Sequence, residues 1–271
     1  MKIQEGEAVW RVRNYLLWEG SNKFFCRGHI TSGPKPWYPI IVFSLIQIFS
    51  LLYFGFPIVH FLMIGHVYFA IIAIPLWLTV SVSLLWTSFI DPGYVLKQSK
   101  SFPWFLERQS TLMKGGMVPL KFCATCNIIW APRTIHCSYC DCCVERMDHH
   151  CPWLGCCIGK RNYTLFFIFI TSLAFYCVFA VLSTLAHLVA LMVEYNSSHN
   201  FGWSIWYTFR WSPVAIPLIA IASFTSIFVL LLVTYHCKLA RKGLTTHEDM
   251  KMPQGKLYNP YLDSTWKSIF R

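Results

Sequence analysis

Residues 38–58 read YPIIVFSLIQIFSLLYFGFPI, without one charged side chain. Three further uncharged, apolar stretches lie at about residues 67–90, 164–193 and 214–237. Because an α-helix rises about 1.5 Å per residue, a run of about 20 apolar residues crosses the hydrocarbon core of a bilayer. Each of these stretches reaches that length. The sequence therefore predicts an all-α membrane protein with four transmembrane helices.

The composition agrees with this fold class and excludes several functions. Only 13% of the residues are charged and 55% are hydrophobic, whereas a soluble domain has about 25% charged residues. This balance excludes a disordered protein and argues against a water-soluble enzyme. The four stretches contain no Asp, Glu, Lys or Arg, which argues against an ion transporter or channel.

The basic residues indicate how the chain is oriented. Of the 23 Lys and Arg residues, only Arg210 lies in the connection 194–213, and none lies between the first two spans. Cytoplasmic segments carry an excess of Lys and Arg, so both termini are expected in the cytosol. The net charge of +11 then faces anionic lipid headgroups rather than nucleic acid, or it serves only to set the topology. The expected segments are a cytosolic N-terminal segment 1–36, a transmembrane hairpin 37–90, a cytosolic cysteine-rich domain 91–163, a second transmembrane hairpin 164–237 and a cytosolic tail 238–271.

The connection between the second and third spans is rich in cysteine. Nine of the twelve cysteines lie between Cys123 and Cys157. A disulfide framework needs an oxidising compartment, so on the cytosolic side this density indicates zinc. Spacing alone favours one all-cysteine site and leaves the other candidate ligands unassigned. That site would be formed by Cys123, Cys126, Cys137 and Cys140.

The run Asp148-His149-His150-Cys151 places a carboxylate, an imidazole and a thiol within four residues. These are the groups that an activated nucleophile needs: the thiol attacks, the imidazole takes its proton, and the carboxylate orients the imidazole. Proximity in sequence does not require contact in space. A role in metal binding alone is therefore the alternative for this run.

The full pattern resembles the signature of the DHHC protein S-acyltransferases, or palmitoyltransferases. It reads Cys123-x2-Cys126-x9-His136-Cys137-x2-Cys140-x2-Cys143-x4-Asp148-His149-His150-Cys151-x5-Cys157-x4-Asn162-x3-Phe166. Two shorter motifs of that family are also present: Asp91-Pro92-Gly93 follows the second span, and Thr245-Thr246-His247-Glu248, which matches the family's TTxE pattern, follows the fourth. The family's C-terminal aromatic-and-Asn motif has no clear match, and Asn259 is the candidate for its Asn.

The resemblance implies two interleaved structural zinc ions in place of the single site suggested by spacing. It also implies that Cys151 is the nucleophile, His149 the base, Asp148 the group that orients this base, and Thr246 a contact of the aspartate. Cys142 and Cys156 lie outside the family pattern and are bystanders or additional acylation sites. The implied zinc ligands are Cys123, Cys126, His136 and Cys143 for one ion, and Cys137, Cys140, His150 and Cys157 for the other.

The implied reaction has two steps. Cys151 takes a fatty acyl group from acyl-CoA, with palmitoyl-CoA as the donor, and passes it to a cysteine of a substrate protein near the membrane. Burying the acyl chain is worth about 0.8 kcal/mol per methylene, so we expect a cavity lined by the third and fourth spans. Trp153 would close its cytosolic end or anchor the chain at the interface. Lys160 and Arg161 would meet coenzyme A phosphates or lipid headgroups.

Proteins of this family reside in the Golgi, the endoplasmic reticulum or the plasma membrane, and an accessory subunit is compatible with the same sequence. The rival interpretation is a catalytically inactive, zinc-bearing membrane adaptor that recruits cytosolic partners. Both interpretations require zinc, so only a covalent thioester on the chain separates them.

Overall fold

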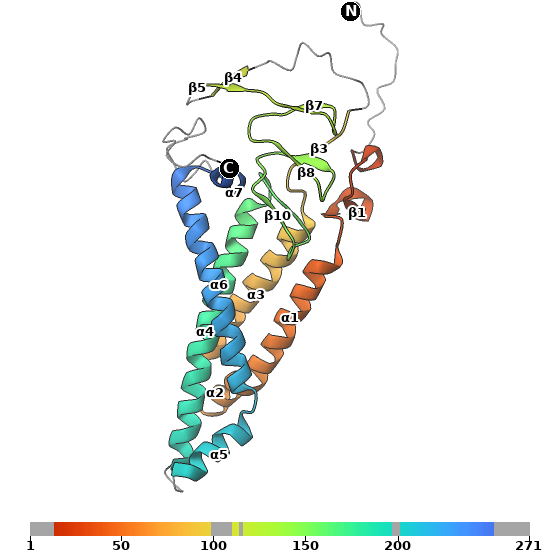
Figure 1. Ribbon diagram of the computed structural model, residues 1–271. Helices are drawn as coiled ribbons and strands as arrows, with labels where there is room; N and C mark the ends of the chain where they lie inside the picture. Colours follow the sequence, from red (N-terminus) through yellow and green to blue (C-terminus); the bar gives the residue numbers. More distant parts are fainter. Residues whose placement is uncertain (1–13, 99–109, 114–115, 197–200, 252–271) are drawn as a thin grey trace, which may run out of the picture.

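The computed structural model describes residues 14–98, 110–113, 116–196 and 201–251. Four helices in this part of the chain are long and apolar enough to cross a membrane, which confirms the predicted fold class. They form a bundle with the cysteine-rich connection at one end (Figure 1). The helices are α1 (Trp37–Tyr53), continued by η3 (Phe54–Ile58) and α2 (Val59–Met63), α3 (Tyr68–Phe89), α4 (Tyr163–Asn196), α5 (Phe201–Trp211), α6 (Ala215–Lys242) and α7 (Thr246–Lys251).

The first span is longer than its apolar stretch suggested. It runs from Trp37 to Met63 because the helix passes through Pro57 in one π-helical turn. Proline lacks the N–H that an α-helical turn requires, and a π-turn is a local adjustment that lets the helix continue. The chain reverses at Gly65, whose φ of 85° is left-handed and suits glycine.

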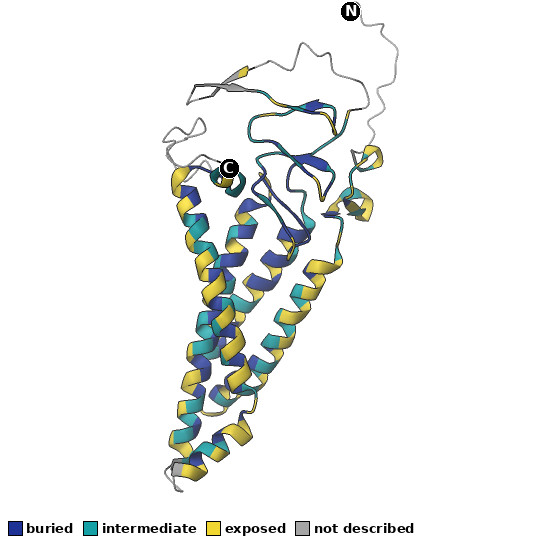
Figure 2. Cartoon of the chain, in the orientation of Figure 1, coloured by how far each residue is buried: buried dark blue, intermediate teal, exposed yellow. Residues whose placement is uncertain are grey.

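Helix α4 is the centre of the bundle, since it packs along both α3 and α6. Its buried face includes Ala174 and Ala180, and Ala73 of α3 and Ala222 of α6 are also buried. Small side chains allow the helix backbones to approach closely, which is how spans associate in lipid. Large apolar side chains cover the outer faces of the spans, where Figure 2 shows exposed residues along each helix.

Polar side chains join the spans inside the bundle. Gln47 of α1 accepts a hydrogen bond from Trp77 Nε1 at 2.9 Å and donates one to Ser81 of α3 at 3.1 Å. The hydroxyl of Tyr176 in α4 donates to Ser50 of α1 at 2.8 Å. These contacts satisfy polar groups that lipid could not solvate.

In its described residues, the cysteine-rich connection forms short antiparallel strand pairs and no helix. Three sheets contain the candidate zinc ligands: β6 pairs with β7, β9 pairs with both β3 and β8, and β10 pairs with β11. Further strands pair before the first span and upstream of Cys123. The strands are β1 (Lys23–Phe25), β2 (Ile30–Ser32), β3 (Tyr94–Val95), β4 (Ser110–Met113), β5 (Gly116–Pro119), β6 (Phe122–Cys123), β7 (Ile128–Ile129), β8 (Ile135–Cys137), β9 (Cys142–Val144), β10 (His149–Cys151) and β11 (Cys156–Ile158), with 3-10 turns η1 (Asn14–Leu17) and η2 (Cys26–Gly28) before the first span.

Two side chains attach this domain to the spans. Asp91, at the end of α3, accepts hydrogen bonds from the backbone N–H groups of Gly93 and Tyr94, both at 2.8 Å, and pairs with Arg161. The fully buried amide of Asn162 donates to the Thr87 carbonyl of α3 at 3.2 Å and to the Cys157 carbonyl of β11 at 3.0 Å. Asp91 of the Asp91-Pro92-Gly93 motif and Asn162 of the cysteine-rich pattern therefore join the domain to the spans.

Candidate metal centres and active site

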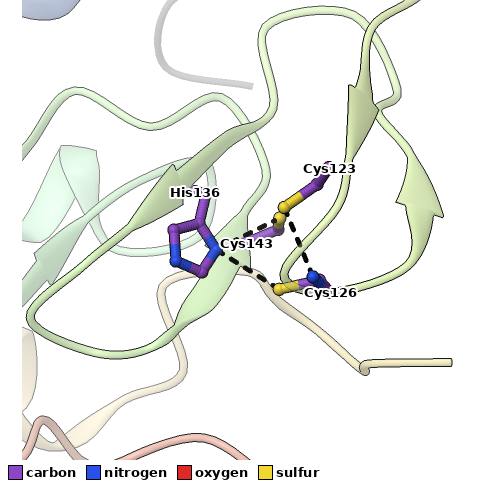
Figure 3. Close-up of side chains that lie close together, drawn as sticks. All are labelled: Cys123, Cys126, His136 and Cys143. Carbon is purple, nitrogen blue, oxygen red and sulfur yellow. Dashed lines mark hydrogen bonds between the residues drawn. The ribbon is translucent and has the colours of Figure 1, made fainter. Parts of the chain in front are cut away.

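The first cluster of candidate metal ligands is drawn in Figure 3. Cys123 and Cys126 come from β6 and its turn, whereas His136 and Cys143 are directly paired in the register of β8 and β9. The four ligand atoms lie within 4.8 Å of one another, and the three cysteines are buried. Trp130 Nε1 donates to the Cys143 sulfur at 3.2 Å, an outer contact of the kind that orients a metal ligand.

The second cluster is built in the same way on the next hairpin. His150 and Cys157 are directly paired in the register of β10 and β11. Cys137 and Cys140 come from β8 and the turn that follows it. The ligand atoms again lie within 4.8 Å of one another, with the cysteines buried.

Strand geometry explains why the two clusters interleave. His136 and Cys137 are consecutive in β8, and consecutive side chains of a strand point to opposite faces. Each therefore belongs to a different cluster. The single all-cysteine site that spacing favoured is wrong: among the described residues, no such group joins Cys123 and Cys126 to Cys137 and Cys140.

Both clusters fit zinc by their chemistry. Each offers three thiols and one imidazole, a Cys₃His set that binds zinc tetrahedrally. Four protein ligands leave no position for water, which is typical of a structural ion rather than a catalytic one. The residues present could therefore hold two metal ions that stabilise the hairpins.

Because side chains alternate between the two faces of a strand, β10 separates its candidate metal ligand from its candidate catalytic residues. His149 and Cys151 point to one face of the strand and His150 points to the other. Cys151 is only 7% exposed and belongs to the same buried cluster as side chains of the spans, including Phe166 of α4. The hairpin thus presents an imidazole and a thiol to the membrane end of the domain.

Asp148 fixes the His149 ring. Its carboxylate accepts a hydrogen bond from His149 Nδ1 at 2.7 Å and two from Thr246, one from the backbone N–H at 2.8 Å and one from the hydroxyl at 2.7 Å. Burial raises the pKa of Asp148, but its hydrogen bond to His149 and the nearby positive charge outweigh burial, so this pKa is lowered overall. Burial lowers the pKa of His149, but its interactions with Asp148 and Cys151 prevail and raise the pKa to about 9.

A capping box places Thr246. The Thr245 hydroxyl accepts from the Glu248 N–H at 3.2 Å, and the Glu248 carboxylate accepts from the Thr245 N–H at 2.8 Å. This reciprocal pair starts helix α7. Arg133, from the zinc-ligand region, donates to both oxygens of Glu248 at 2.8 and 2.7 Å. The motif after the fourth span is therefore linked to the β8 side of the domain, a role of Arg133 that the sequence did not indicate.

Ring side chains from α4 and α6 pack around and beyond His149. Its ring meets the Phe166 ring edge-on at 5.3 Å between centroids, and Phe166 meets His236 of α6 in the same way at 5.1 Å. The Tyr163 hydroxyl and His236 Nδ1 are 3.0 Å apart. Sequence reasoning missed His236, although an imidazole within an apolar span is itself a signal of function.

An apolar cavity of about 420 Å³ lies between the spans. Its size falls within the usual range for ligand sites, about 300–1,000 Å³. The third and fourth spans line it as expected, but α1 contributes as well, and among the described residues no lining residue comes from α3. Trp153 lines one end and is 66% exposed. Other lining residues are Val42, Phe49, Tyr176, Leu218 and Ala222.

The remaining residues singled out in the sequence are two cations, two cysteines and Asn259. Lys160 pairs with Glu145 at 3.0 Å, and Arg161 pairs with Asp91, so both cations take part in contacts within the chain. Cys142 and Cys156 are buried, at 0% and 1% exposed, which disfavours acylation of either thiol by an outside donor. Asn259 lies outside the described residues.

Comparison with known proteins gives consistent matches. A family model described as DHHC palmitoyltransferase matches residues 117–253. The chain is 34% identical over 255 residues to palmitoyltransferase ZDHHC18-A of Danio rerio, covering 88% of this chain and 53% of that protein. It is 33% identical to ZDHHC18 of Rattus norvegicus, covering 88% and 64%, and 34% identical to ZDHHC14 of Homo sapiens, covering 92% and 54%. The chain thus spans between about half and two thirds of these relatives.

Proposed function

The chain belongs to the DHHC palmitoyltransferase family, and from this premise we propose that it is a protein-cysteine S-palmitoyltransferase. The observation that carries the proposal is the position of the Asp148, His149 and Cys151 side chains. They lie in or next to strand β10, whose hairpin packs on the spans and contributes Trp153 to the lining of an apolar cavity. A zinc-bearing adaptor would need neither an oriented imidazole beside a thiol nor a cavity for a lipid chain.

In the first step the Cys151 sulfur attacks the thioester carbonyl of palmitoyl-CoA. Its proton passes to His149, whose pKa of about 9 favours the imidazolium beside a thiolate. The carbon–sulfur bond to coenzyme A breaks, and the departing sulfur takes the proton from His149. Asp148 holds Nδ1 throughout, so the ring keeps one orientation.

In the second step a substrate cysteine repeats the attack on the Cys151 thioester. His149 accepts the proton of this thiol and returns it to Cys151 as the acyl group leaves. The acyl chain stays in the cavity between α1, α4 and α6, with Trp153 over the carbonyl end. The ions held by the two Cys₃His sets would supply rigidity to the hairpins, and their closed ligand sets give them no part in the chemistry.

We further infer that both termini and the cysteine-rich domain face the cytosol. This orientation is supported by the positions of Lys and Arg in the sequence, since only Arg210 falls in the connection 194–213 and none falls between the first two spans. Acyl-CoA and the thiols of substrate proteins would then reach Cys151 from the cytosol.

The experiment that tests the proposal is intact mass measurement of detergent-purified protein after incubation with palmitoyl-CoA. We expect one palmitoyl adduct that neutral hydroxylamine removes, absent from Cys151→Ser and present in the control Cys142→Ser. No adduct on protein that retains two zinc ions would favour the adaptor. An equal adduct on Cys151→Ser would place the thioester on another cysteine.

A further inference from the structure

Cys156 is a buried thiol that neither metal cluster includes, and it is directly opposite Cys151 in the register of the β10–β11 hairpin. Directly opposite residues of an antiparallel pair point to the same face, with their Cα atoms about 4.5–5.5 Å apart. A disulfide requires Cα atoms about 4.4–6.8 Å apart. The hairpin at the foot of the domain (Figure 1) therefore already holds these two residues at a distance that a disulfide can bridge.

We propose that Cys151 and Cys156 form a peroxide-oxidisable dithiol, in which Cys151 is oxidised first and Cys156 then closes a disulfide with it. The inference rests on the proposed function, because it takes Cys151 to be the reactive thiol. Cys156 would protect the nucleophile from irreversible oxidation.

The chemistry balances with hydrogen peroxide as the oxidant. The Cys151 thiolate attacks one peroxide oxygen, an S–O bond forms, the O–O bond breaks and hydroxide leaves. The sulfur is then a sulfenic acid, oxidised at the expense of the peroxide. The Cys156 thiol attacks this sulfur, an S–S bond forms, the S–O bond breaks, and the hydroxyl group leaves with the thiol proton as water.

Cys156 is free to make this attack in a way that the neighbouring cysteines are not. Cys157 points to the opposite face of β11, into the second metal cluster. Cys142 is opposite Cys137 in the β8–β9 pairing, but Cys137 is itself a candidate ligand. The Cys156 thiol makes one contact to the Thr87 carbonyl, at 3.7 Å, and a thiol is a weak donor whose contact is easily given up.

Turn geometry favours the same closure. The chain between the two cysteines reverses over Pro152–Gly155, where the Gly155 N–H donates to the Pro152 carbonyl at 3.1 Å. Gly155 has a φ of 63°, and a Cβ there would lie 2.6 Å from the Lys35 carbonyl, so only glycine fits. This tight turn keeps Cys151 and Cys156 in register before any oxidation.

The test is peptide mapping of detergent-purified, zinc-loaded protein after brief exposure to hydrogen peroxide. Thiols are then blocked with N-ethylmaleimide under denaturing conditions with a chelator, and trypsin releases residues 147–160, which contain Cys151, Cys156 and Cys157. We expect this peptide to lose two hydrogen atoms and to carry one label instead of three. Cys142→Ser should behave like the unmodified chain.

The variant Cys156→Ser should form no disulfide in this peptide, and its Cys151 should proceed to sulfinic acid. Acyl-enzyme formation should therefore recover with dithiothreitol in the unmodified chain and fail to recover in Cys156→Ser. Cys156→Ala provides a second variant, and zinc content is measured in every sample. Full labelling of all three cysteines, a disulfide in Cys156→Ser, or linkage only after zinc loss would overturn the inference.

A parallel sample separates this inference from the function on which it rests. Unoxidised protein is incubated with palmitoyl-CoA before peroxide, and an acylated Cys151 should then resist disulfide formation. If Cys151 forms the palmitoyl adduct but no sample contains the disulfide, the redox inference is wrong and the proposed function stands. If protein that was never exposed to peroxide forms no palmitoyl adduct, the proposed function is wrong, and so is the inference that rests on it.

Discussion

The Thr246 hydroxyl donates a 2.7 Å hydrogen bond to the same Asp148 oxygen that accepts from His149 Nδ1. The Thr246 backbone N–H binds the other oxygen of this carboxylate at 2.8 Å. A residue just beyond the fourth span thus holds the aspartate of the cysteine-rich domain from both sides. Glu248 accepts a hydrogen bond from the Thr245 N–H in the capping box and binds Arg133, and these contacts position the adjacent Thr246.

Replacing Thr246 with Val should slow formation of the acyl-enzyme. The substitution keeps the backbone hydrogen bond and the side-chain shape, but the buried, charged Asp148 carboxylate loses the hydrogen bond that the Thr246 hydroxyl donates. A hydrogen bond to a charged group is worth about 1.5–3 kcal/mol, so we expect a 10- to 100-fold lower rate in single-turnover measurements. Thr246→Ser should retain most of the rate. A normal rate in Thr246→Val would show that the carboxylate needs no support from α7.

Removing Glu248 should destabilise the domain more than a surface ion pair would. The Arg133–Glu248 pair is nearly buried, with side chains 11% and 13% exposed, and removal of one partner of a buried pair costs about 3–5 kcal/mol. We expect both Glu248→Ala and Arg133→Ala to lower the melting temperature in detergent. The double variant should lose less than the sum of the two single variants. Additive losses would mean that the pair makes no energetic contribution.

Zinc content distinguishes two cysteines that face one another. Cys137 and Cys142 are directly paired in β8 and β9, yet only Cys137 belongs to a metal cluster. Cys137→Ser should therefore reduce the zinc content from two ions per chain to one and abolish the palmitoyl adduct, because the β10–β11 hairpin loses its support. Cys142→Ser should keep both ions. Equal zinc loss in the two variants would refute this ligand assignment.

The raised pKa of His149 has a consequence for stability. The folded-state pKa is about 9 against an ordinary value of 6.5, so the protonated ring favours folding. Its contribution is complete below pH 6.5 and is lost as the pH rises towards 9. The melting-temperature difference between the unmodified chain and His149→Gln should thus shrink from pH 6.5 to pH 9. A difference that is constant or grows over this range would contradict the assigned charge state.

The sequence specified the spans better than it specified the site. Apolar length alone locates four helices, because each span must satisfy its own backbone in lipid. Spacing of Cys123, Cys126, Cys137 and Cys140 led to the wrong cluster, since strand faces decide which ligands converge and the pairing of β8 with β9 is not written in the spacing. The Arg133–Glu248 contact joins residues 115 positions apart, and no local pattern predicts it.

The contribution of α1 to the cavity was missed for a related reason. Every span is apolar all round, so periodicity does not reveal which helix faces a lipid chain and which faces the bilayer. The contacts that decide this, such as Tyr176 with Ser50, link distant segments. The order of the helices around the cavity is therefore a tertiary property.

The cavity itself can be tested by filling it. Ala222 of α6 is buried and lines the cavity, whereas Ala220 of the same helix is exposed on its outer face. Phenylalanine at position 222 would occupy space needed by the end of a palmitoyl chain. Two methylenes are worth about 1.6 kcal/mol of burial, so Ala222→Phe should favour myristoyl-CoA over palmitoyl-CoA by about 10-fold relative to the unmodified chain. Competition between the two donors, read by the mass of the acyl-enzyme, measures this ratio. Ala220→Phe should leave the ratio unchanged, because its ring would lie among lipids. If both variants alter the ratio equally, or neither alters it while both retain their melting temperature, the acyl chain occupies another space.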